Sequence, residues 1–274
     1  MGRGRHKQFG RRNTAGKPLS KGLRYVTGRH VIEELLAHSP ERIVKVFVVE
    51  NAQARGKGEG ARKRDLLFQL KDIRKEVQEL SFDELSALVG TTSHQGFAAI
   101  VHEREAMDLS EFFDEVREKD NSLVLILDEI NDPQNLGALL RVAECFGVDA
   151  VIWSKNRGVD VTPVVSKASV GASEIVPIIR VSNLNDAAKK LKDEGYWVAA
   201  AVINEKAKSL HEFETPKKIA LIVGSEGEGI GRLLGEVSDY LLYIPLEGKI
   251  QSLNVSQATA ILLYELRRQI KKCF

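Results

Sequence analysis

Cysteine is nearly missing from this chain. There are two in 274 residues, Cys145 and Cys273, and neither stands in a metal-type spacing such as C-x-x-C. The sequence therefore argues against a disulfide framework and a zinc site, and it fits a reducing cytoplasm. Long apolar runs are missing too: none approaches the roughly 20 residues that span a bilayer, and the N-terminus has no apolar signal segment. We expect no membrane partner and no metal.

Acidic residues are missing from the first 24 positions, which hold eight Lys or Arg. The whole chain has 40 basic and 38 acidic residues, so the remainder carries 32 against 38 and is slightly acidic. A flexible polybasic arm attracts phosphate without needing a fold. We predict a basic flexible tail over residues 1–22, while a solvated tail without a role and an organelle transit peptide remain open.

After the tail, residues 23–104 alternate between helical and strand patterns. The spacing of apolar residues predicts helices at 29–38, 65–77 and 82–90. Runs rich in β-branched or small apolar residues predict strands at 43–49 and 97–102. Between them, the stretch 53–64 holds three glycines and five basic residues and is predicted to be a loop.

The rest of the chain predicts a second α/β domain. Residues 105–122 are highly charged and are predicted to be a linker with a helix in its middle, capped by Asp108 or Ser110. From 123 to 274, strand and helix alternate with short connections, which predicts a mainly parallel sheet covered on both faces. The predicted strands are 123–127, 149–153, 175–179, 196–203, 219–223 and 240–244. The predicted helices are 135–146, 163–169, 183–194, 229–237 and 252–272.

Three polar or glycine-rich segments adjoin these strands. They are NDPQNLGALLR (131–141), IVGSEGEGIG (222–231) and IPLEGKIQSLNVSQATA (244–260). Open α/β sheets build ligand sites at the carboxyl ends of their strands. Three such segments in one sheet predict a single pocket.

Each segment alone has a plain structural explanation. Asn135 and Arg141 can share a helix face that suits an anion, but a helix cap and a surface arginine explain them as well. The glycine loop lacks the Lys and Ser/Thr of a P-loop and a strict G-x-G-x-x-G. It is therefore either a loop that lets a ligand come close to the backbone or a tight turn. A helix cap at Ser252 explains only one residue of the cluster Ser252, Asn254 and Ser256.

Taken together, the segments resemble one family. In order, N-x-G-x-x-x-R, V-G-S-E-G-x-G and I-P-x-x-G-x-x-x-S-L-N-V-S resemble the three signature motifs of the SpoU (TrmH-type) 2′-O-ribose RNA methyltransferases, over about residues 123–270. The stretch from YVTGRHVIEELL to SHQGFAAIV is similar to that family's substrate-binding domain, which has the fold of ribosomal protein L30e. With both halves, the chain most resembles the enzymes that methylate guanosine in large-subunit (23S-type) ribosomal RNA.

The resemblance implies an architecture and a cofactor. It implies an L30e-like RNA-binding domain over 23–104 and a knotted (trefoil, SPOUT-type) methyltransferase domain over 123–274, through which the chain would form a homodimer. The cofactor would be S-adenosyl-L-methionine, without a metal. By motif match, the residues that hold it would be Gly224, Ser225, Gly229, Ile244, Leu246 and Leu253.

The resemblance also implies methyl transfer to a ribose 2′-hydroxyl. Arg141 matches the family arginine that activates this hydroxyl. Because arginine keeps its proton, we favour a donor that stabilises developing alkoxide charge, and leave proton abstraction open. Asn135 would orient Arg141 or the ribose. Glu226 would fix Arg141 or Asn254, while Ser252 and Asn254 would line the site.

The N-terminal domain would select the RNA. Its expected contacts are basic or polar residues of the loop 53–64, of the first helix and of the turn before the last strand. They are Arg29, His30, Arg55, Lys57, Arg62, Lys63, Arg64 and Gln95. A solvated charged turn would explain the loop equally well.

Three alternatives stay open. A tRNA guanosine 2′-O-methyltransferase would use the same motifs, although such enzymes often lack this N-terminal domain. A noncatalytic L30e-like RNA-binding protein would explain the first half only. A nucleotide-dependent dehydrogenase is the third.

Overall fold

The computed structural model describes residues 17–50, 59–104, 107–204, 206–225, 227, 229–249 and 252–271. They form two compact units whose main division lies between Glu103 and Arg104.

The first unit is built on a four-stranded sheet of order β1-β4-β2-β3. Its strands are β1 (Leu23–Thr27), β2 (Ile43–Val49), β3 (Glu76–Leu80) and β4 (Phe97–His102). Its helices are α1 (Arg29–His38), a 3-10 turn (Pro40–Arg42), α2 (Glu59–Asp72) and α3 (Phe82–Val89). Helix α3 packs on the face that carries Tyr25, Phe47 and Ala98. It begins at a capping box, in which Ser81 and Glu84 bond each other's backbone amides, and it ends at the left-handed Gly90.

Two boundaries in this unit differ from the prediction. Residues 59–64, expected in the loop, open helix α2, because apart from Gly60 they are good helix formers. The helix expected to reach Val77 ends at Asp72, since Arg74 turns the chain with φ +55, and Val77 lies in β3. Strands β1 and β3 were not predicted, and β3 is too polar to signal a strand. The rest of the expected loop, 53–58, lies outside the described residues.

The second unit is built on a seven-stranded sheet of order β7-β6-β5-β10-β8-β11-β9, and every pair formed by these described strands is parallel. This confirms the predicted parallel α/β fold. The strands are β5 (Ser122–Asp128), β6 (Ala150–Ser154), β7 (Ile178–Val181), β8 (Trp197–Ala201), β9 (Lys208–Ser209), β10 (Lys218–Gly224) and β11 (Tyr240–Tyr243). The helices are α4 (Leu109–Val116), α5 (Pro133–Cys145), α6 (Pro163–Ala168), α7 (Leu184–Asp193), α8 (Arg232–Val237) and α9 (Val255–Lys271), with 3-10 turns at Ala172–Glu174 and Leu210–Glu212.

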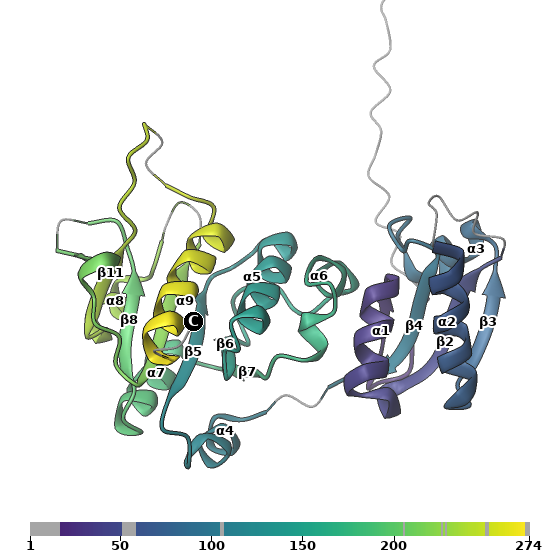
Figure 1. Cartoon of the computed structure of the whole chain (residues 1–274), viewed down its shortest axis with the longest axis horizontal. Coiled ribbons are helices and arrows are strands. Elements are labelled where there is room, and N and C mark those ends of the chain that lie inside the picture. Colours follow the sequence, from purple (N-terminus) through teal and green to yellow (C-terminus); the bar gives the residue numbers. More distant parts are fainter. Residues whose placement is uncertain are drawn as a thin grey trace, which may run out of the picture. The chain divides into compact units, whose positions relative to one another are not determined.

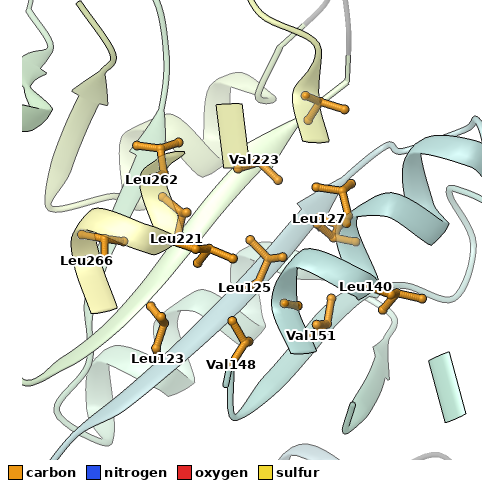
Figure 2. Close-up of a cluster of buried hydrophobic side chains, with 14 of the residues drawn as sticks. Leu123, Leu125, Leu127, Leu140, Val148, Val151, Leu221, Val223, Leu262 and Leu266 are labelled. Atoms are coloured by element: carbon orange, nitrogen blue, oxygen red, sulfur yellow. The ribbon is translucent and has the colours of Figure 1, made fainter. Parts of the chain in front are cut away.

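Helices cover both faces of this sheet. On one face, α5 and α9 lie side by side over Leu125 and Leu221, within the cluster of Figure 2 (Figure 1, Figure 2). On the other face, α4, α7 and α8 cover Val124 and Ile126. All seven residues of β5 are buried, as expected of a central parallel strand.

The segment expected to be a linker contributes to this second core. Helix α4 lies in it and is capped by Asp108, one of the two predicted caps. Its Phe112 and Val116 are buried against the sheet. Residues 109–116 are therefore an integral helix of the second unit.

Candidate active site

A cavity of about 760 Å³ opens at the carboxyl ends of β8, β10 and β11. These strands are neighbours in the order β10-β8-β11, so the chain segments that leave them converge at one edge of the sheet. The walls come from those strand ends, from the stretch 252–255 and from the first turns of α9. Its size is that of a small-molecule site.

The glycine loop folds back onto the end of β10. The Gly229 amide donates to the Ser225 carbonyl at 3.1 Å, and Gly227 and Gly229 adopt φ of +111° and +69°, which favour glycine. A β-carbon on Gly224 would collide with the Gly229 carbonyl. The loop therefore closes only with glycine at these points, and it presents backbone to the cavity.

The structure places all six predicted cofactor residues in the wall of this cavity. Three belong to the glycine loop and three are apolar side chains; they are Gly224, Ser225, Gly229, Ile244, Leu246 and Leu253. Ser252 and Asn254 line it as well. A glycine cradle beside apolar walls fits an adenosine-type ligand such as S-adenosyl-L-methionine.

Asn254 joins two of the motifs. Its Nδ2 donates to the Asn135 Oδ1 at 3.1 Å, which connects the start of α9 to α5. Its Oδ1 accepts from the Ser256 amide at 2.9 Å and the Ser256 hydroxyl at 2.6 Å. Asn254 therefore caps α9, in place of the suggested Ser252, since the helix begins three residues later than predicted.

Asn135 is not a helix cap either. The cap of α5 is Asp132, whose side chain accepts from the Gln134 amide, and Pro133 occupies the first turn. Asn135 follows inside the helix with its side chain turned to Asn254. The cap explanation of this residue is therefore wrong.

Arg141 lies on the exposed side of α5. Within the described part of the chain, no side chain or carbonyl pairs with its guanidinium, and it is not part of the cavity wall. It is thus available to a ligand that reaches α5 from outside. Glu226, the residue expected to fix Arg141 or Asn254, lies outside the described residues.

Motif reasoning missed one wall of the cavity. Ala201, Val202 and Ile203, at the end of β8, line it beside the glycine loop. They carry neither a glycine signature nor a polar group. Only the position of β8 between β10 and β11 could have indicated them.

A buried carboxylate anchors the loop on the opposite face of the sheet. The Gly231 amide donates to the Asp128 Oδ2 at 2.8 Å, which ties the end of the loop to the end of β5. Burial raises the pKa of Asp128 above its ordinary range, and the bond from Gly231 opposes this shift. Sequence analysis did not single out Asp128.

In the first unit, some predicted RNA contacts come together. Arg29 and His30 form the first turn of α1, and Gln95 turns the chain with φ +55° before β4. The Gln95 Oε1 would lie 3.6 Å from a β-carbon at Gly28, so the turn lies against the start of α1. Arg64 is exposed on α2. Arg62 and Lys63 belong to α2 by their backbone, and Arg55 and Lys57 lie outside the described residues.

The described residues lack two features. They contain no group of three or more His, Cys, Asp or Glu that could hold a metal ion. They also contain no helix long and apolar enough to cross a membrane.

Comparison with known proteins matches both halves of the chain. The model of the SpoU rRNA methylase family matches residues 122–264, and a model described as RNA 2′-O ribose methyltransferase substrate binding matches residues 25–107. The 23S rRNA (guanosine-2′-O-)-methyltransferase RlmB of Coxiella burnetii (strain RSA 493 / Nine Mile phase I) is 40% identical over 248 residues, which are 90% of this chain and 96% of that protein.

Solved structures agree. An RNA 2′-O ribose methyltransferase superposes with a TM-score of 0.73 and 25% identity, covering 91% of this chain and 90% of the other. The SpoU methyltransferase AviRb from Streptomyces viridochromogenes, solved in complex with AdoMet, has a TM-score of 0.71 and 22% identity over 92% of each chain, which shows the shared fold.

These matches place both units in one class of protein, the methyltransferases that act on RNA ribose. Within that class, the chain belongs to the SpoU rRNA methylase family. The resemblance seen in the sequence motifs is thereby confirmed.

Proposed function

We propose that this chain transfers a methyl group from S-adenosyl-L-methionine to the ribose 2′-hydroxyl of a guanosine in large-subunit ribosomal RNA. The observation that carries this proposal is the 40% identity to RlmB over 90% of this chain and 96% of that protein. The match includes the substrate-binding unit, which the choice between RNA targets depends on.

The cavity of the second unit is the proposed cofactor site. When bound, S-adenosyl-L-methionine supplies a methyl group on a sulfonium whose leaving group is neutral. Gly224 and Gly229 let backbone groups approach the ligand, while Ile244 and Leu253 exclude water from its apolar parts.

Arg141 and Asn135 are the proposed groups for the RNA side. As the 2′-oxygen forms its bond to the methyl carbon, it releases its proton to solvent water and passes through alkoxide character. A guanidinium that stays protonated stabilises that charge by donating N–H bonds, and it also gathers the adjacent phosphate. Asn135, linked to Asn254 at the cavity wall, is the proposed positioning residue between α5 and the cofactor site.

The first unit is proposed to select the RNA. Arg29, His30 and Gln95 gather at the start of α1, where backbone N–H groups favour an anion such as phosphate. We keep Arg55, Lys57, Arg62, Lys63 and Arg64 as proposed contacts. The proposed location is the cytoplasm, where ribosomal RNA is found.

We also propose a homodimer formed through the second unit, with the trefoil knot that the family implies. In support, α9 exposes two large apolar side chains, Ile261 and Tyr264, that are 42% and 51% exposed. Tyr264 contacts Phe146 edge-on, with ring centroids 6.1 Å apart, so the apolar surface extends from α9 to the end of α5. A surface of this kind fits a partner helix.

The first experiment is methylation in vitro with labelled S-adenosyl-L-methionine and separate pools of unmodified ribosomal and transfer RNA, followed by mapping of ribose methyl groups. One 2′-O-methylguanosine in large-subunit RNA is the expected result. Label only in transfer RNA would contradict the proposed substrate. The transfer RNA pool is included because a relative of 38% identity is named as a TrmH family tRNA/rRNA methyltransferase. Absence of both label and cofactor binding would leave a noncatalytic RNA-binding protein.

A further inference from the structure

A second cavity, of about 590 Å³, opens at the carboxyl ends of β5, β6 and β7. It lies on the α7 and α8 side of the sheet, since Leu184 and Leu234 in its wall belong to the core of that face. The proposed cofactor cavity lies on the α9 side, where Val255 and Leu262 belong to the other core. The glycine loop separates the two cavities. Gly229 and Ile230 line the proposed cofactor cavity, and Gly231 lines the second cavity.

One carboxylate oxygen in the wall of this second cavity takes no bond from the described residues. Asp128 is only 8% exposed, and its Oδ2 accepts from Gly231. Within the described part of the chain, no donor bonds its Oδ1. The rest of the Asp128 side chain is buried, so a ligand that brings N–H groups into the cavity can donate to this oxygen.

Cationic groups stand in the wall of the same cavity. Arg157 is largely exposed, with its Nη1 2.7 Å from the Glu129 Oε1, and Arg232 pairs with Glu236. The Arg157 and Arg232 side chains are themselves largely exposed, so each guanidinium can turn to a phosphate at little cost. The cavity thus takes N–H donors inside and an anion beside them, which are the two ends of a nucleotide.

We propose that this cavity holds an unpaired guanine nucleotide of the RNA, distinct from the nucleotide that is methylated. Guanine carries adjacent N1–H and N2–H donors, which match the two oxygens of the Asp128 carboxylate, and its phosphate would lie between Arg157 and Arg232. The nucleotide is distinct from the target because the cavity and the cofactor site lie on opposite faces of the sheet. The inference rests on the proposed function, since it takes RNA as the substrate.

The test is binding of guanosine monophosphate to the full, ¹⁵N-labelled chain in the presence of saturating S-adenosylhomocysteine, which occupies the cofactor cavity. We expect the nucleotide to shift the amide resonance of Gly231, which reports directly on Asp128. Uridine monophosphate has a single ring N–H and no amino group, so its Kd should be higher by about tenfold or more. No shift of Gly231 at millimolar guanosine monophosphate, or equal binding of both nucleotides, would overturn the proposal.

Three variants assign the contacts. Asp128→Asn keeps an acceptor for Gly231 but loses the carboxylate. It should weaken the binding of guanosine monophosphate by about tenfold. If the Asp128→Asn variant fails to fold, Arg232→Ala on the exposed start of α8 replaces it. This variant should weaken the binding of both nucleotides alike. Asp114→Asn, which alters only an exposed pair with Arg117, is the matched control and should bind normally. Unchanged binding in both cavity variants would sink the assignment.

The methylation assay tests the proposed function and the guanine nucleotide site separately. Nucleotide binding at Gly231 in a chain that methylates no RNA would keep the cavity assignment and reject the proposed function. In an active chain, Asp128→Asn should raise KM for RNA and leave binding of S-adenosylhomocysteine unchanged. An unchanged KM would reject the cavity assignment while the proposed function stands.

Discussion

Asn254 performs two tasks with the two ends of one amide. Its oxygen caps α9, and its nitrogen reaches across to Asn135 on α5. The residue therefore joins the helix that lines the cofactor cavity to the helix that carries Arg141. Its two tasks can be separated by substitution, because aspartate keeps the cap and loses the donor.

Asn254→Asp should keep the melting temperature and lower kcat about ten- to a hundredfold, because the bond that Asn254 donates to Asn135 is lost and the alignment of the site depends on it. Asn254→Ala should lose activity and also about 1 kcal/mol of folding free energy, because the cap is gone. Thermal unfolding and single-turnover methylation measure the two effects. Full activity in the aspartate variant would show that the link to Asn135 has no positioning role.

Arg141→Ala should lower methyl transfer about 10²–10³-fold, the usual cost of removing one donor to developing negative charge. Binding of S-adenosylhomocysteine, followed by calorimetry, should not change, because Arg141 is not part of the cavity wall. Arg117→Ala, on the exposed end of α4, is the control and should remain active. If Arg141→Ala methylates normally, its proposed role is wrong.

At the scale of elements, the glycine of the first motif serves packing. Gly137 lies where α5 crosses α6, and a β-carbon there would collide with Ala168 and approach the Val165 carbonyl to 2.9 Å. Alanine normally stabilises a helix relative to glycine. Here the close approach of the two helices reverses that preference.

Gly137→Ala should therefore destabilise the protein by about 1–3 kcal/mol, the cost of overpacking. Gly235→Ala in α8 is the matched control. Apart from its chain neighbours and its own helix backbone, no atom among the described residues lies within 4 Å of the β-carbon it would add, so it should gain about 0.5–1 kcal/mol. Urea midpoints of the two variants measure both effects, and a stabilised Gly137→Ala would refute the packing argument.

Helix α9 is anchored near its end by Glu265. Its oxygens accept from Arg268 and from Gln269, and Gln269 in turn donates to the Phe213 carbonyl. The bonds from Arg268 lower the pKa of Glu265 to about 2. Because the folded pKa lies below the unfolded one, this contribution to stability is present at neutral pH and is lost as the pH falls towards 2.

Glu265→Gln should cost about 1 kcal/mol at pH 7, since Arg268 is half exposed and solvent screens the pair. The difference from the unmodified chain should shrink as the pH is lowered from 5 to 3. Glu236→Gln, in a pair whose two partners are both more than half exposed, is the control and should change stability little. Urea unfolding across this pH range is the measurement, and a difference that grows in acid would contradict the sign.

At the scale of the whole molecule, the exposed apolar surface of α9 predicts association of two copies. Tyr264→Asp places a charge on this surface and should convert the dimer to a monomer in size-exclusion chromatography with light scattering. Phe68→Asp, at the most exposed aromatic side chain of α2, should leave the dimer intact. A Tyr264→Asp variant that stays dimeric would move the interface away from α9.

The sequence by itself determined the class of fold, most of the order of elements in the second unit and the motif residues. Continuous apolar runs such as 123–127, bounded by polar residues, favour strands buried on both faces, and glycines such as Gly224 indicate a tight turn or close backbone approach, so these features are local. The order of the strands in the sheet decided which distant residues meet at the cavities. Placing β8 between β10 and β11 brings Ala201–Ile203 into the proposed cofactor cavity, and placing β5 beside β10 brings Asp128 to Gly231, 103 residues away in the chain. Such contacts depend on which strands pair, and no local pattern encodes that.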